Sequence, residues 1–78
     1  MNIQINEIEK VFQNAFNSKV IITAETKKED IPEWDSLNHL NLIIELEDNF
    51  KINFTKDEIV KITSVKSLLE ILNKKLEL

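Results

Sequence analysis

The sequence predicts an all-α fold, in which three main helices and one short helix form a four-helix bundle with a long loop after the first helix. Apolar residues recur three and four positions apart along several stretches, and this spacing places them on one side of an α-helix. Polar residues that favour helix starts precede these stretches. The one β-branched run, Val20–Thr23, has no convincing partner strand. Helices with apolar stripes bury them against one another, which gives a bundle.

The first predicted helix carries one apolar stripe, and Asn2 or Asn6 is expected to cap its start. The stripe consists of Ile8, Val11, Phe12, Ala15 and Phe16. Residues 17–35 follow as a long connection, which we predict to be an extended loop whose apolar side chains dock on the core. Ile31-Pro32 closes this loop, because a residue before proline avoids the helical conformation. Irregular connections of such length are uncommon in compact domains and are often functional.

A second helix is predicted from Ser36 to about Phe50, with Asp35 as its N-cap. The Asp35 carboxylate suits both the free amides and the positive end of the helix dipole. Apolar residues cover more than half of the circumference, so we expect a central helix that packs on several sides. These residues are Leu37, Leu40, Leu42, Ile43, Ile44, Leu46 and Phe50.

Two further helices are predicted in the last third of the chain. Thr55–Glu58 matches a capping box and opens a short helix, which is expected to bury Ile59 and Ile62. Thr63 or Ser64 then caps the last helix. Its stripe consists of Val65, Leu68, Leu69, Leu72 and Leu76.

Length and composition exclude several classes of function. The 78 residues fit one domain, residues 1–78. The net charge of −4 and the lack of arginine argue against nucleic acid, whose phosphates need basic patches. Without cysteine there is no disulfide or thiolate metal site, and without glycine there is no P-loop or dinucleotide fingerprint. No apolar run reaches membrane-spanning length, and the first residues lack signal-peptide features. We therefore expect a cytoplasmic protein without a metal site or membrane insertion.

Ser36 is the candidate for chemistry, because it lies in the first turn of the second predicted helix, at the end of the long loop. Backbone amides there lack partners and the helix dipole favours an anion. A phosphodiester on this serine would be partly stabilised by the helix end. The alternative interpretation is that Ser36 merely caps the helix.

The segment around this serine resembles the acyl or peptidyl carrier protein family, over nearly the whole chain. The resemblance rests on Asp35-Ser36-Leu37, on the acidic and aliphatic pattern that follows it, and on the segment 61–65. The pattern consists of Leu40, Leu42-Ile43, Leu46-Glu47-Asp48, Phe50, Ile52 and Thr55-Lys56-Asp57-Glu58, and the segment is Lys61-Ile62-Thr63-Ser64-Val65.

The resemblance implies a carrier and not an enzyme. Ser36 would receive a 4′-phosphopantetheine arm from coenzyme A through a phosphopantetheinyl transferase, and the arm would hold cargo as a thioester. Asp35 would help present the serine, and Leu37 would both anchor the helix and touch the transferase. The implied partners are this transferase, an acyl-loading ligase or synthase and downstream acyltransferases, which the carrier would meet as a monomer.

Members of the family dock partners through acids on the second helix. Glu47 and Asp48 match this pattern, with Glu45 nearby, and a plain solvated face is the alternative for all three. If partner docking does not depend on salt, it indicates instead an apolar interface around Leu37, Leu40 and Ile44.

The first half of the second helix is neutral, because Asn38 and Asn41 stand where fatty-acid carriers usually have acids. We therefore expect a dedicated pathway, such as polyketide, nonribosomal peptide or polysaccharide modification, in preference to general fatty acid synthesis. The rival hypothesis is a helical interaction module that carries no prosthetic group.

Trp34 and His39 flank the serine. Trp34 is interpreted as a hydrophobic clamp that fixes the loop on the helix, with a cargo or partner contact as the alternative. His39 is expected to be a packing or rim residue. A Ser-His-Asp hydrolase is rejected, because neighbouring positions on one helix rarely give triad geometry and no Gly-rich oxyanion loop exists.

Overall fold

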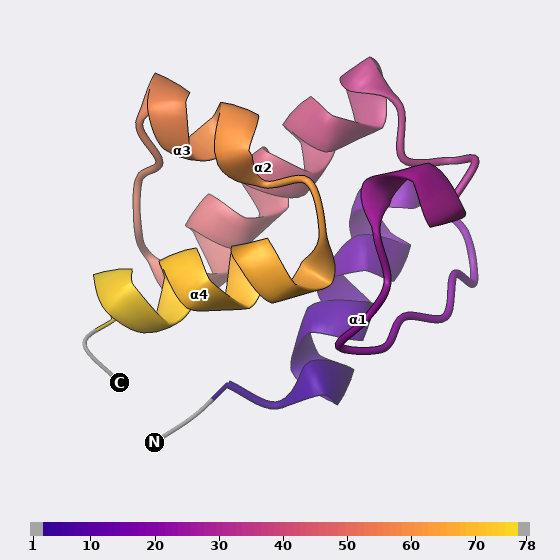
Figure 1. The fold of residues 1–78 in the computed structure, drawn as a ribbon, viewed down its shortest axis with the longest axis horizontal. Coiled ribbons are helices and arrows are strands. Elements are labelled where there is room, and N and C mark those ends of the chain that lie inside the picture. Colours follow the sequence, from indigo (N-terminus) through magenta and orange to yellow (C-terminus); the bar gives the residue numbers. More distant parts are fainter. Residues whose placement is uncertain (1–2, 77–78) are drawn as a thin grey trace.

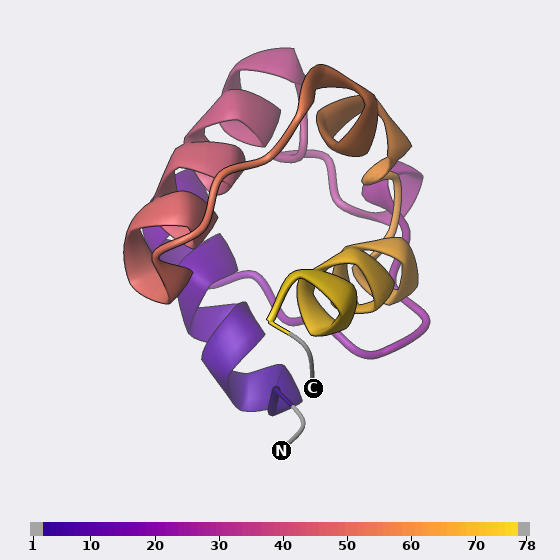
Figure 2. The same cartoon turned by 90° about the vertical axis from the view of Figure 1, so that its left-hand side faces the viewer.

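Residues 3–76 are described by a computed structural model, which shows an all-α fold (Figure 1). In this range α1 (Ile5–Phe16), α2 (Ser36–Phe50), α3 (Lys56–Lys61) and α4 (Val65–Lys75) follow one another, and a 3₁₀ helix, η1 (Lys28–Asp30), interrupts the first loop. α1 packs along α2, while α3 and α4 close the other side of the bundle (Figure 2). The predicted fold class of three main helices and one short helix is confirmed.

α1 buries the predicted stripe of five apolar residues, so its packing face is confirmed. The predicted cap is wrong for Asn6, which lies inside the first turn, and Asn2 lies outside the described residues. Gln4 occupies the N-cap position and makes no side-chain cap hydrogen bond. The stripe, buried against the core, stabilises this helix without a capping side chain.

The first loop is extended and docks on the core, as predicted. Val20 and Ile22 are buried. Polar side chains of α1 form hydrogen bonds with the backbone of these two residues. Gln13 Nε2 donates to the Val20 carbonyl at 3.0 Å, and the Ile22 amide donates to Glu9 Oε2 at 3.1 Å. These side chains take the place of a neighbouring strand, which explains why a β-branched run forms no sheet here.

α2 spans the predicted residues but packs differently from the expectation. Its buried side chains are His39, Leu42, Ile43 and Leu46, which share one side of the helix. Leu37, Leu40 and Ile44 are 69%, 54% and 60% exposed. The expectation of burial on several sides is therefore wrong, because α2 buries only the side that faces the core and presents these three residues on the opposite one.

The caps of α3 and α4 lie where the sequence predicts them. Thr55 and Glu58 form the capping box of α3, and Ser64, not Thr63, is the N-cap of α4. Ile62 is buried at the end of α3, whereas Ile59 is only half-buried, so its predicted burial is partial. The stripe of α4 is confirmed: Val65, Leu68 and Leu72 are buried, and Leu69 and Leu76 are half-buried.

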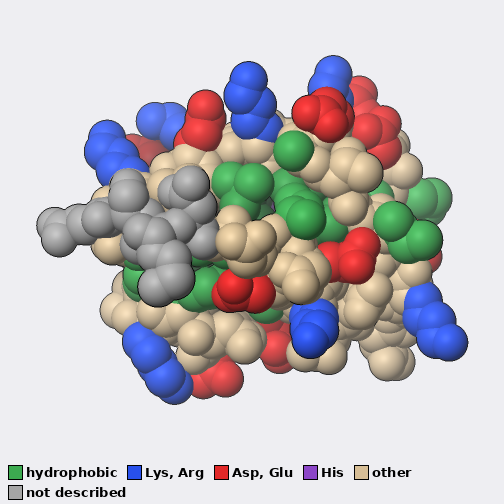
Figure 3. Space-filling view, turned by 90° about the horizontal axis from the view of Figure 1, so that it is seen from below, with side chains coloured by type: hydrophobic (Ala, Val, Ile, Leu, Met, Phe, Trp, Pro, Cys, Tyr) green, Lys and Arg blue, Asp and Glu red, His purple; other side chains and the backbone are tan. Residues whose placement is uncertain are grey.

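The face of the molecule that is seen from below Figure 1 mixes acidic and basic side chains with apolar ones (Figure 3). None of the helices in residues 3–76 has both the length and the apolar character that crossing a membrane requires. The same range contains no cluster of side chains suited to hold a metal ion.

Glu58 also connects α3 to α4. Lys75 Nζ lies 2.8 Å from Glu58 Oε1, and the Thr55 amide donates to the same oxygen at 2.9 Å. The hydrogen bond from Lys75, followed by that from the Thr55 amide, holds the pKa of the Glu58 carboxyl below its ordinary value of 4.5. The ionised carboxylate is therefore the form that stabilises the native state.

Lys75→Met is expected to lower the protection of α3 amides from hydrogen exchange by about two- to fivefold at pH 7, the range of a partly exposed ion pair. A carboxyl group with a lowered native pKa stabilises the fold above its unfolded pKa and stops doing so as the pH falls through the native one. The difference between wild type and Lys75→Met should therefore shrink below pH 4.5 and vanish once Glu58 is protonated. A difference that persists in acid would show that Lys75 acts through its cation–π contact with the Phe54 ring instead.

Candidate functional site

The start of α2 is capped by Asp35. Its Oδ1 accepts a hydrogen bond from the Asn38 amide at 2.8 Å, and its carbonyl accepts one from the His39 amide at 2.7 Å. An aspartate N-cap satisfies a free amide and places negative charge at the positive helix end. The predicted capping role of Asp35 is therefore confirmed.

Ser36 follows as the first residue of α2, with an exposed side chain. Its hydroxyl makes no hydrogen bond to any other residue in the described range 3–76. The hydroxyls of Thr55 and Ser64 behave differently, since each accepts an amide hydrogen bond at its own helix start. The interpretation of Ser36 as a simple cap is thus wrong, because Asp35 already does that work.

On its outer side, the junction between the loop and α2 is held by Asn38. Asn38 Nδ2 donates to the Glu33 carbonyl at 2.8 Å, and Asn38 Oδ1 accepts from Asn41 Nδ2 at 3.1 Å. An ionised carboxylate at position 38 could not donate to a carbonyl. The neutral first half of the helix therefore has a structural function, which the sequence alone does not reveal.

On its inner side, the same junction is held by Trp34, which is 3% exposed. The indole ring meets the Phe12 ring edge-on, with 5.0 Å between centroids, and lies 6.2 Å from the Phe16 ring. This confirms the hydrophobic clamp. A buried ring leaves no exposed surface for the alternative contact with cargo or partner.

His39 is buried with both ring nitrogens engaged. Trp34 Nε1 donates to His39 Nδ1 at 2.8 Å, and His39 Nε2 lies 2.9 Å from the Ile59 carbonyl oxygen. It is therefore a packing residue, as expected, and it offers no nitrogen to Ser36. The rejection of a Ser-His-Asp hydrolase thus has a geometric basis.

The residues predicted to meet partners fall into two groups. Leu37, Leu40 and Ile44 lie on one side of α2, and we call them the exposed apolar face. Among the acids, Asp48 is exposed and Glu45 is half-buried. The third acid, Glu47, binds the loop after α2, because its Oε2 accepts a hydrogen bond from the Phe54 amide at 2.9 Å.

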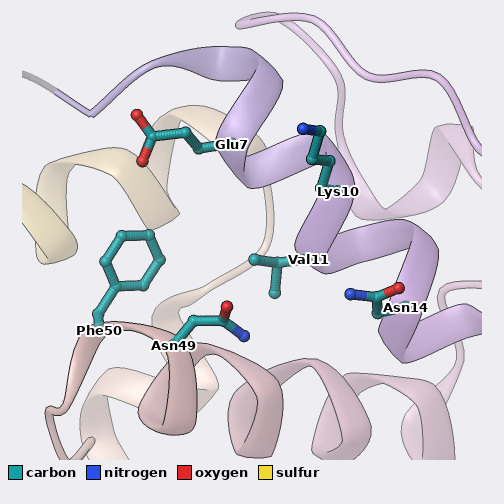
Figure 4. Close-up of a pocket in the computed structure, with 6 residues that line it drawn as sticks. All are labelled: Glu7, Lys10, Val11, Asn14, Asn49 and Phe50. Atoms are coloured by element: carbon teal, nitrogen blue, oxygen red, sulfur yellow. The ribbon is translucent and has the colours of Figure 1, made fainter.

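A groove of about 300 Å³ lies between α1 and the last turn of α2 (Figure 4). Its lining is mixed, with a carboxylate, an ammonium group and two amides beside Val11 and Phe50. At a rise of about 1.5 Å per residue, the last turn of α2 is roughly 20 Å from Ser36. The groove is therefore not part of the serine site.

No match is found among protein-family models or among curated proteins. Among solved structures, the fold matches the solution NMR structure of holo acyl carrier protein from Geobacter metallireducens, with a TM-score of 0.82. The two sequences are 37% identical, and the match covers 92% of this chain and 84% of the other. Sequence identity of this size over nearly all of both chains, on a shared four-helix fold, places this chain in the acyl carrier protein family, whose members carry acyl groups and do not catalyse reactions themselves.

Proposed function

We propose that this chain carries acyl or aminoacyl intermediates as thioesters on a 4′-phosphopantetheine arm attached to Ser36. The observation that carries this assignment is an exposed serine hydroxyl without a hydrogen-bond partner among residues 3–76, at a helix start already capped by Asp35. A hydroxyl with no structural task is accessible for modification. The family, whose matched member is a holo protein, supports the same assignment.

The site suits a phosphodiester. The start of α2 offers positive helix-dipole potential to an anion on Ser36. The Ser36 oxygen forms a bond to the pantetheine-bearing phosphorus of coenzyme A, the bond from that phosphorus to adenosine 3′,5′-bisphosphate breaks, and the serine proton passes to the transferase. Asp35 fixes the first turn during this transfer, and exposed Leu37 contacts the transferase. When bound, the arm supplies the thiol that holds cargo.

The test is the intact mass of the purified chain after incubation with coenzyme A, Mg²⁺ and a broad-specificity phosphopantetheinyl transferase. One added phosphopantetheine group, located by fragmentation on the peptide that contains Ser36, is the expected result. A folded sample that gains no mass with several transferases would exclude the carrier assignment and favour an interaction module without a prosthetic group.

Partners are proposed to dock on α2 as well. The exposed apolar face begins one residue after Ser36, and Asp48 with Glu45 adds negative charge in the second half of the helix. Glu47 contributes its charge while bound to the Phe54 amide. The partners are the transferase, an acyl-loading ligase or synthase and downstream acyltransferases. The half of α2 next to Ser36 is neutral, whereas fatty-acid carriers usually have acids there. We therefore favour a dedicated polyketide, nonribosomal peptide or polysaccharide-modification pathway over fatty acid synthesis.

Leu40→Ala is expected to raise the KM of the transferase for the carrier about tenfold, because a central apolar contact of an interface is worth about 1–2 kcal/mol. Asp48→Asn should raise this KM only about twofold. Added salt should remove the difference in KM between wild type and Asp48→Asn, since exposed charges are screened within about 8–10 Å. Steady-state loading at two ionic strengths measures both effects. Ile21→Ala is the matched control, because Ile21 is likewise an exposed apolar residue, 80% exposed, that belongs to the long loop and not to α2. A larger effect of Asp48→Asn than of Leu40→Ala would show that charge dominates docking.

A further inference from the structure

The only tryptophan and the only histidine of the chain make a buried polar contact directly beneath the serine junction. The indole N–H of Trp34 can only donate, and the Ile59 carbonyl can only accept. His39 must therefore accept at Nδ1 and donate at Nε2, which is the neutral Nε2–H tautomer. Trp34, His39 and Ile59 thus form one continuous chain of hydrogen bonds, which we call the Trp34–His39–Ile59 bridge.

The bridge joins two segments that the chain itself does not bring together. Trp34 belongs to the loop just before Ser36, and Ile59 lies in α3, twenty residues after His39. α3 has only six residues and no fully buried side chain, so it is too short to persist without outside contacts. The carbonyls of the last turn of a helix lack their usual intrahelical partners. The Ile59 carbonyl accepts a long hydrogen bond from the Ile62 amide, at 3.4 Å, and the shorter one from His39.

α3 is therefore fastened at both ends. The capping box and the Glu58–Lys75 ion pair hold the first turn of α3. The bridge holds its last turn against His39 of α2, which lies one turn after Ser36. Cutting the bridge would remove this polar contact between α3 and α2, leaving only the apolar packing of Ile59 and Ile62, and would leave the buried indole N–H without an acceptor.

We propose that His39 is a positioning residue for the loading of Ser36: it fixes α3 and the loop before the serine as one rigid surface that the transferase meets. This inference rests on the proposed function. It assigns His39 no proton transfer and no contact with coenzyme A, so the expected effect is on recognition of the carrier and not on the chemical step.

His39→Leu removes both hydrogen bonds at similar side-chain volume and is expected to raise the KM of the transferase for the carrier about tenfold, with kcat changed less than about twofold. His39→Gln keeps an acceptor and a donor that can reach the same partners, so it should restore KM to within about threefold of wild type. Trp34→Phe keeps most of the aromatic packing and removes the N–H donor together with the smaller ring of the indole, so it should raise KM about threefold. This milder variant tests the bridge even if His39→Leu does not fold.

Ser64→Ala is the control for general destabilisation, because it removes the N-cap of α4 without touching the bridge. If Ser64→Ala raises KM as much as His39→Leu, or if folded His39→Leu and Trp34→Phe both load like wild type, His39 has no positioning role. Failure of His39→Gln to restore KM would also exclude the role, because it would show that the ring itself matters and not its hydrogen bonds.

Hydrogen exchange separates this inference from the proposed function, since it needs no transferase. Amides of α3 and of residues 33–35 should exchange about tenfold faster in His39→Leu, and near the wild-type rate in His39→Gln. Unchanged exchange in the folded variants would show that the bridge does not hold α3. If wild type takes no phosphopantetheine, the proposed function fails and the loading role falls with it, while exchange still decides whether His39 holds α3.

Discussion

Replacing Ser36 with alanine is expected to abolish attachment of phosphopantetheine completely, while the fold and the stability remain close to those of wild type. The loss is total because the alanine side chain has no oxygen to bond to phosphorus. Stability should change by less than about 0.5 kcal/mol, because the Ser36 side chain is exposed and alanine is a better helix former. Intact mass after loading and thermal unfolding by circular dichroism measure the two effects.

Ser64→Ala provides the opposite pattern for comparison with Ser36→Ala. The Ser64 hydroxyl accepts the Ser67 amide at 3.1 Å as the N-cap of α4, so its loss should cost about 1 kcal/mol while the serine at position 36 still loads. Loading of Ser36→Ala at any rate near that of wild type would locate the arm on another residue. A large loss of stability in Ser36→Ala would instead mean that this hydroxyl has a structural role.

Trp34→Ala is expected to unfold the protein or bring it close to unfolding. Removing a buried tryptophan costs about 3–5 kcal/mol, against a total stability of only roughly 5–10 kcal/mol for a domain of this size. The change empties the space that the indole fills beside the Phe12 and Phe16 rings and leaves His39 Nδ1 without its donor. At about 4–8 °C per kcal/mol, the melting temperature should fall by about 15–30 °C or more in thermal unfolding by circular dichroism.

Trp34→Phe separates the packing of this ring from its hydrogen bond. Phenylalanine keeps most of the aromatic contact with Phe12 and loses the indole N–H, so the variant should lose about 1–3 kcal/mol and remain folded. Equal losses in the two variants would mean that the hydrogen bond to His39 dominates. A small loss in Trp34→Ala would contradict the clamp on which the serine junction depends.

The elements that depend on local contacts could be predicted from the residue types and their spacing. The start of α2 follows from Asp35, whose carboxylate binds an amide three residues later, and the start of α3 follows from the capping box at Thr55–Glu58. The apolar stripe of α1 likewise follows from residue spacing alone. Such interactions span at most one helical turn, so the residue types and their spacing are sufficient to predict them. The motif around Ser36 indicated the family for the same reason, because it is contiguous.

The contacts between distant segments could not be predicted in this way, because they depend on how the helices pack. The apolar arc of α2 is wide enough to face the core on either side, and only the position of α1 settles that Leu42 and Leu46 are buried while Leu37, Leu40 and Ile44 stay exposed. The hydrogen bond from His39 to the Ile59 carbonyl joins α2 to α3, which are separated by the loop after Phe50. A backbone carbonyl leaves no mark in the sequence as a hydrogen-bond acceptor, and its partner depends on how the helices pack, which residue spacing does not specify.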